Sequence, residues 1–217
     1  MNRSTTLFLL LILSLASCAQ NANPAKEIPA QKVQESPSED FYQKLAAAAF
    51  ELTKDKVTYD PAYYVLTYPN GDVPPDKGVC TDVVIRAYRK MGIDLQKEVH
   101  IDMKKNFTLY PSKRKWGLTR PDKNIDHRRV LNLQVYFTRF GTSVKVTDNA
   151  SDYLPGDIVT WDLGGGVTHI GIVANHKVDK QDRYQIVHNI GRGQVLEDCL
   201  FDWTITGHYR YDGTVKM

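Results

Sequence analysis

The chain has 217 residues, a formal net charge of +3 and 42% hydrophobic residues. A charge this close to balance gives no reason to expect a polyanionic partner, so the composition speaks against a nucleic-acid-binding protein. Residues 39–217, which follow a polar N-terminal stretch, are numerous enough for one domain with a sizeable core.

The first residues predict export from the cytoplasm. Arg3 precedes an apolar run over residues 7–15, and small residues lead to Cys18. A basic start and an apolar core of this length form a secretion signal, which is too short to span a membrane. The four residues LASC, ending at Cys18, also resemble a bacterial lipobox. That resemblance implies that residues 1–17 are removed and that Cys18 carries the lipid anchor; an ordinary signal peptide is the alternative.

Residues 18–38 are predicted to be a flexible tether, because they are polar and lack apolar periodicity. Ala19 follows Cys18 where the enterobacterial inner-membrane sorting pattern would have an aspartate. We therefore expect an envelope lipoprotein on the periplasmic face of the outer membrane, tied to that membrane by its lipid, with an exported and membrane-anchored protein as the alternative. We also expect a monomer.

The first folded element is a predicted helix. Ser36 is its candidate N-cap, Pro37 lies in the first turn, and the helix runs through an alanine-rich segment to about Thr53. A tyrosine-rich stretch follows and ends in a turn at residues 68–72. These aromatic residues, Tyr68 among them, are candidates for lining a cleft or for packing against the next helix.

The segment DKGVCTDVVIRAYRKM, residues 76–91, organises the rest of the chain. Its apolar residues recur every three to four positions, which predicts a helix from Thr81 to Met91 with its basic residues, such as Arg86, exposed to water. This arrangement puts the Cys80 thiol in the first turn, where free N–H groups and the helix dipole favour a thiolate, the nucleophile of acyl transfer. A small buried residue on the inner face of the helix is the alternative.

Residues 97–128 are charged and poorly periodic, and we predict a long loop that acts as a lid or as a wall of the substrate site. Asp126 is a candidate N-cap for a helix over residues 130–140. His127, next to two arginines, is predicted to be neutral, and Arg128 is a candidate for binding a substrate carboxylate. A helix cap and a solvated first turn are the alternatives for these residues.

After Gly141 the hydrophobic pattern changes to a period of two. Short strands are predicted at residues 143–147, 158–161, 167–175, 184–189 and 207–211. Successive short strands with tight turns form an antiparallel sheet, so the fold class is α+β, with the Cys80 helix packed on the sheet. The three glycines at residues 164–166 lie between two strands and therefore form a hairpin tip, not a phosphate loop.

Two histidines lie on adjacent predicted strands. His169 is at the start of one strand and His188 is near the end of the next, so an antiparallel hairpin can bring the two rings together. A lone histidine on a strand is usually a core residue, but this pair accompanies a cysteine at a helix start. Asn189 is the alternative to His188 as the partner of His169. Strand alternation sends these two adjacent side chains to opposite faces, so only one of them can point at His169.

These blocks resemble the NlpC-type papain-like cysteine peptidases of bacterial cell walls. The shared features are a cysteine at a helix N-terminus, a Leu-Pro-Gly-Asp turn, a His-x-Gly-Ile-Val strand and a Val-His strand. The resemblance implies a papain-like fold for residues 39–217, with Cys80 as nucleophile, His169 as base and His188 as the residue that orients the base. It also implies an amidase or endopeptidase that hydrolyses amide bonds in peptidoglycan peptides.

More closely, the segments GVCTDVVIRAY, IDHRRVLN and HNIGRG resemble an uncharacterised bacterial domain family within that superfamily, which has an Asp-His-Arg-Arg segment between nucleophile and base. The candidate substrate-binding residues are Tyr68, Asp82, Asp126, His127 and Arg128.

Three alternatives stay open. A non-catalytic module on the same fold would bind wall peptides or a partner protein, and a disulfide between Cys80 and Cys199 would favour it. An acyltransferase on the same scaffold is the second alternative. A zinc site built from Cys80, His169 and His188 is the third, although the chain has no CxxC or HExxH motif and we predict no metal and no cofactor.

Overall fold

The computed structural model describes residues 37–214. The predicted signal peptide at residues 1–17, the predicted lipid anchor Cys18, all but the last two residues of the predicted tether over residues 18–38 and the Ser36 cap lie outside the described residues. Inside them, no helix is both long enough and apolar enough to cross a membrane.

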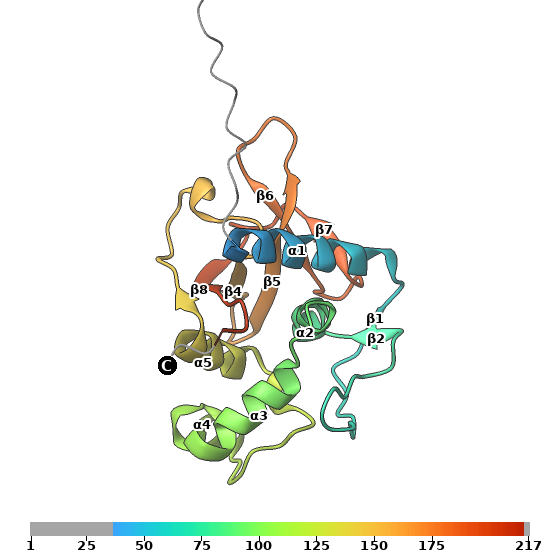
Figure 1. Cartoon of the computed structure of the whole chain (residues 1–217), viewed down its shortest axis with the longest axis vertical. Helices are drawn as coiled ribbons and strands as arrows, with labels where there is room; N and C mark the ends of the chain where they lie inside the picture. The colour runs from blue at the N-terminus through green and yellow to red at the C-terminus, as the bar shows by residue number, and fades with distance from the viewer. Residues whose placement is uncertain (1–36, 215–217) are drawn as a thin grey trace, which may run out of the picture. The chain divides into compact units, whose positions relative to one another are not determined.

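The described residues contain five α-helices, labelled in Figure 1, and four short 3-10 turns. The helices are α1 (Pro37–Glu51), α2 (Cys80–Lys90), α3 (Leu95–Asn106), α4 (Ser112–Trp116) and α5 (Val130–Phe140). The strands are β1 (Thr58–Tyr59), β2 (Lys77–Gly78), β3 (Thr142–Ser143), β4 (Ile158–Asp162), β5 (Thr168–Lys177), β6 (Tyr184–His188), β7 (Val195–Glu197) and β8 (Thr204–Arg210).

Six of the strands form one antiparallel sheet in the order β3-β8-β4-β5-β6-β7. Helices α1, α2 and α5 contact β5 and cover one face of this sheet, whereas α3 and α4 lie farther from the strands (Figure 1). The predicted α+β class, with the Cys80 helix packed on an antiparallel sheet, is confirmed. Strand β3 spans only Thr142–Ser143, so just one of the five residues predicted for it, Ser143, lies in a strand. Strand β7 was not predicted, because a three-residue strand has too few positions to display a period.

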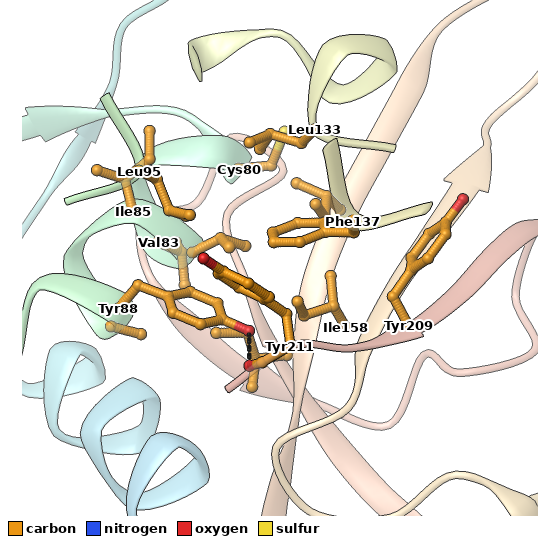
Figure 2. Close-up of a cluster of buried hydrophobic side chains, with 14 of the residues drawn as sticks. Cys80, Val83, Ile85, Tyr88, Leu95, Leu133, Phe137, Ile158, Tyr209 and Tyr211 are labelled. Carbon is orange, nitrogen blue, oxygen red and sulfur yellow. Dashed lines mark hydrogen bonds between the residues drawn. The ribbon is translucent and has the colours of Figure 1, made fainter. Parts of the chain in front are cut away.

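Alternation along the strands divides the hydrophobic core in two. Ile170 and Ile172 of β5 belong to the cluster under the helices, whereas Val173 and Trp161 belong to a second cluster on the opposite face. Figure 2 shows the first cluster, in which side chains of α2 and α5 meet those of the sheet and Cys80 lies at its edge.

Helix α2 is buried on more faces than its sequence predicts. Arg86 is only 9% exposed, so the prediction that it faces water is wrong. The segment before the helix covers this face: Arg86 donates hydrogen bonds to Asp72 and to the carbonyl oxygens of Pro74 and Lys77. The hydrophobic periodicity of a helix does not show whether another segment buries its polar face, so the burial of Arg86 could not be predicted from α2 alone.

The prediction of one long loop over residues 97–128 is also wrong, because α3 and α4 occupy much of this range. The buried stripe of α3 is a narrow row of Leu95, Val99 and Met103 among charged residues, so its amphipathic signal is weak. Asp94 caps the helix by accepting a hydrogen bond from the backbone N–H two residues on, at 3.0 Å.

The Leu-Pro-Gly-Asp turn before β4 has a structural role. Asp157 is buried and accepts hydrogen bonds from the Leu154 N–H at 2.9 Å, from His208 and from Arg210 of β8. Gly156 has a φ of +85°, and a side chain there would meet the backbone of Tyr42 in α1. The turn therefore fixes the start of β4 to both the last strand and the first helix.

Candidate active site

Cys80 is the first residue of α2. The residue before it, Val79, is extended, and its N–H donates to Asp82 Oδ2 at 2.7 Å, which closes a cap over the first turn. Cys80 is 6% exposed and lines a pocket of about 240 Å³. The other residues that line this pocket are Tyr59, Pro61, Val79, Trp116, Ile125, Arg128, Arg129, Val130, Leu131 and Thr168.

The end of strand β6 makes room for the thiol. Ile172 of β5 pairs with Val187, and β6 stops one residue later at His188, so residues 168–170 of β5 have a free edge on this side. Cys80 lies at that edge, and the N–H of Ile170 donates a hydrogen bond to its sulfur. The thiol therefore lies beside the backbone of the residue that follows His169.

The predicted stabilisation of a thiolate is wrong for the free protein. Burial raises the pKa of the Cys80 thiol to about 12, and the N–H groups of Ile170 and Thr81 offset only part of this effect. The sulfur is almost fully buried. Loss of water destabilises the thiolate by more free energy than the N–H groups of Ile170, Thr81 and Cys80 itself supply.

The two predicted histidines do meet. His169 Nε2 lies 2.8 Å from His188 Nδ1, and both rings are buried. A third residue, which the sequence analysis did not identify, extends this pair into a hydrogen-bonded series: His188 Nε2 lies 3.0 Å from Glu197 Oε2 on β7. Cys199 Sγ lies 3.5 Å from the same His188 nitrogen.

This series fixes the tautomer of each ring. A carboxylate only accepts hydrogen bonds, so neutral His188 carries its proton on Nε2, facing Glu197, and accepts from His169 through Nδ1. His169 must then donate from Nε2, which leaves its Nδ1 with a free electron pair. Burial lowers the pKa of both rings, that of His169 to about 3 with a contribution from His188, so both are neutral near pH 7.

Asn189 does not compete for His169. Its amide donates to the carbonyl oxygen of Gly78 at 3.2 Å, just ahead of the Cys80 helix. No hydrogen bond joins the Cys80 thiol directly to the His169 ring within residues 37–214; the sulfur meets the Ile170 N–H instead. The histidine pair and the thiol are thus neighbours along β5, not yet bonded partners.

Asp82 and Arg128, two predicted substrate-binding residues, form a buried ion pair with each other. Arg128 Nε and Nη2 donate to the two carboxylate oxygens at 2.9 and 3.0 Å, and Nη1 donates to the carbonyl of Ala62 at 3.0 Å. Thr81 Oγ1 donates to the carbonyl oxygen of Arg128. The pair leaves Arg128 little capacity for a ligand and fixes the start of α2 in place.

The other three candidates lie outside the Cys80 pocket. Asp126 accepts from the backbone N–H of Asp122 and does not cap α5, and burial raises the pKa of its carboxyl to about 6. His127 is buried, and burial together with Arg128 lowers its pKa to about 3, which confirms the predicted neutral ring. Tyr68 packs edge-on against His100 at 5.1 Å between ring centroids.

Two alternatives from the sequence lack structural support. Cys80 and Cys199 are free thiols, so no disulfide joins them. Over residues 37–214, no group of three His, Cys, Asp or Glu side chains is arranged to hold a metal ion, so the residues proposed for a zinc site do not form one.

Gly171 sets the distance between the two histidine strands, which leads to a prediction. A Cβ at this position would lie 2.6 Å from Ile186 Cγ2 and 3.2 Å from His188 Cβ. We expect Gly171→Ala to lower the free energy of unfolding by about 1–3 kcal/mol and to shift the His188 ring signals. Chemical denaturation and NMR would measure both, and a loss below about 0.5 kcal/mol with unmoved ring signals would contradict this packing.

Comparison with known proteins places this site within a family. The family model described as "Domain of unknown function (DUF1287)" matches residues 46–211, a range that contains every residue of the site from Cys80 to Glu197. The uncharacterized protein YijF of Escherichia coli (strain K12) is 51% identical over 167 residues, which are 77% of this chain and 80% of that relative. The chain belongs to the DUF1287 family.

Proposed function

We propose that this protein is a papain-like, NlpC-type cysteine hydrolase, an amidase or endopeptidase that cleaves amide bonds in peptidoglycan peptides. One arrangement carries the proposal: Cys80 starts a helix in a pocket and contacts β5 next to His169, whose ring begins a hydrogen-bonded series that ends at Glu197. A nucleophile, a base with a free electron pair and an oriented support for that base are what acyl transfer requires.

The reaction would proceed in two halves. The Cys80 sulfur attacks the carbonyl carbon of the amide while its proton passes to Nδ1 of His169, and a carbon–sulfur bond forms. The carbon–nitrogen bond then breaks, and His169 returns the proton to the leaving nitrogen. Water, deprotonated by His169, next attacks the thioester, which releases a carboxylic acid and restores the thiol.

This scheme requires a movement on substrate binding. In the free protein the sulfur bonds to the Ile170 N–H, whereas the His169 ring packs against Trp161 on the other face of β5. The ring must therefore turn toward the sulfur when an amide fills the pocket, and catalytic hydrogen bonds commonly tighten at this stage. His188 and Glu197 stabilise the imidazolium that then forms. The N–H groups of Cys80 and Thr81, which face the sulfur in the free protein, would then hold the developing oxyanion.

The proposed location follows from the N-terminal sequence. Residues 1–17 form a signal peptide, and Cys18 carries a lipid that holds the domain at the periplasmic face of the outer membrane. A monomer on a tether would reach wall peptides there, without a cofactor and without nucleic acid as a partner.

A second candidate function is a non-catalytic module that binds wall peptides or a partner protein. The observation that favours it is the protonated state of the thiol, because burial raises the pKa of Cys80 to about 12. A site of this shape with an inert thiol would bind an amide and leave it intact.

The test is hydrolysis of purified peptidoglycan peptides by the full-length protein in detergent, followed by mass spectrometry. We expect Cys80→Ala to reduce the rate at least about 1,000-fold. Since the pKa of His169 is about 3, the base is unprotonated throughout the working range, and the rate should not fall between pH 8 and pH 5.

Two results would count against the enzyme. Intact peptides after prolonged incubation with a folded protein that binds them would favour the non-catalytic module. A rate that falls with a midpoint near pH 6.5 would show a base with the ordinary pKa of histidine and would contradict the role given to the buried His169. Circular dichroism of Cys80→Ala verifies that the variant is folded.

A further inference from the structure

The Cys80 pocket adjoins a larger one. The second pocket, of about 570 Å³, is lined by residues of α4, α5 and the sheet. Leu131 and Thr168 line both pockets, so the two are adjacent. A ligand that lies across these two residues would reach from Cys80 to the space between α4 and α5.

The larger pocket has an excess of positive charge. Three of its lining residues, Arg114, Lys115 and Arg139, are cations, and Asp162 is the single carboxylate among them. Arg139 is neutralised by Asp102, to which it donates at 2.8 and 2.9 Å. Neither Arg114 nor Lys115 has an ion-pair partner among residues 37–214.

Arg129 brings this positive charge to the thiol itself. Its side chain lines the Cys80 pocket, yet its guanidinium makes no hydrogen bond to any residue that the structure describes, and Nη1 is buried. Arg129 forms an ion pair with Asp126, but the carboxylate oxygen is 3.7 Å from Nη1, too far for a hydrogen bond, so the guanidinium donors stay unused. This differs from the neighbouring Arg128, whose donors are occupied by Asp82.

Helix α4 connects these features. Its Trp116 ring lies against the Arg129 guanidinium, 4.1 Å from ring centroid to Cζ, and holds the group in place. The two residues before Trp116 are Lys115 and Arg114. One short helix therefore orients the Arg129 guanidinium in the small pocket through Trp116 and contributes two unpaired cations to the large one.

We infer that the two adjoining pockets bind a peptide with a free carboxylate next to the amide at Cys80, and that Arg129 recognises this carboxylate. A planar guanidinium held by its face and with unused donors binds a carboxylate through two parallel hydrogen bonds, whereas Arg114 and Lys115 attract the acidic chain at longer range. The inference takes the proposed wall peptides as its ligand, but it concerns binding and stands whether or not the peptide is cleaved.

The test measures binding to the full-length Cys80→Ala protein, which cannot cleave. The probes are fluorescent peptidoglycan stem peptides in which the glutamyl, diamino-acid and C-terminal carboxylates are replaced by carboxamides, one at a time. We expect one replacement to weaken binding about 10- to 100-fold. Adding Arg129→Gln should weaken binding of the unmodified peptide to a similar degree and should abolish the effect of that replacement.

Matched variants separate recognition from general charge. Arg129→Lys keeps the charge but loses the planar fork, so it should lose most of the discrimination. Arg114→Gln with Lys115→Gln should weaken binding less, and this loss should shrink at high salt. Lys113→Gln, on the same helix but lining neither pocket, should leave binding unchanged.

The outcomes distinguish this inference from the proposed reaction. The inference is overturned if no carboxamide replacement weakens binding, or if no stem peptide binds. It is also overturned if the Arg129→Gln protein prefers the unmodified peptide over its carboxamide form as strongly as the parent protein does. If the protein with its native Cys80 cleaves no peptide while discrimination through Arg129 persists, the hydrolase proposal fails and the inference holds.

Discussion

Replacing Arg128 by methionine should lower the free energy of unfolding by about 3–5 kcal/mol. The variant would leave the Asp82 carboxylate buried with only the Val79 N–H as a partner, since both of its oxygens now accept from Arg128. The side chains of the pair are 2% and 3% exposed, so water cannot replace the lost guanidinium. Urea denaturation measures the effect.

An exposed ion pair provides the control. Lys54 pairs with Glu51 at 2.7 Å, with side chains 63% and 50% exposed, and Lys54→Met should cost less than about 1 kcal/mol. Asp82→Asn combined with Arg128→Met should be less destabilised than the sum of the single variants, because it leaves no unpaired charge. A loss below about 1 kcal/mol for Arg128→Met would show that Asp82 is not held as a buried ion.

Replacing His188 by phenylalanine should reduce the proposed hydrolysis about 100- to 10,000-fold. The substitution retains a ring in the core but removes both nitrogens, so His169 loses the acceptor for its Nε2 proton. Its tautomer and orientation are then no longer fixed, and the imidazolium that forms during attack loses its support. Steady-state kinetics gives the rate, and NMR of the His169 ring nitrogens shows which one carries the proton.

His208 is a matched control for His188. It is also a buried histidine bonded to an acidic residue, Asp157, but it lies on β8 and supports the turn before β4. His208→Phe should lower stability while the tautomer of His169 and the rate of the folded fraction stay near those of the parent. If His188→Phe and His208→Phe reduce the rate equally, the effect of His188 is structural, and the hydrogen-bonded series from His169 to Glu197 has no role in the reaction.

The elements that the sequence predicted best are those with a strong period. The amphipathic patterns of α2 and α5, and the alternation of β5 and β6, each recur over enough residues to outweigh local exceptions. The meeting of His169 and His188 followed from the same alternation together with an antiparallel hairpin. Both predictions depend on neighbours in the chain.

Features that depend on distant segments could not be predicted in this way. Asp82 and Arg128 are 46 residues apart in sequence, and each alone is typical of a solvated helix turn. The carboxylate that completes the histidine series lies on the three-residue strand β7, which has no recognisable period. The high pKa of Cys80 likewise depends on the segments that bury it, whereas the sequence displays only the helix start that would favour a thiolate.

The position of Glu197 has a consequence for how the protein would respond to heat. It lies on β7, the outermost strand of the sheet on this side, which is short and only partly buried. A strand with one neighbour and few buried contacts separates from its sheet at a lower free-energy cost than the whole domain needs to unfold. His188 would lose its carboxylate at that point while the clusters around α2 stay packed, so the proposed activity would be lost at a lower temperature than the fold.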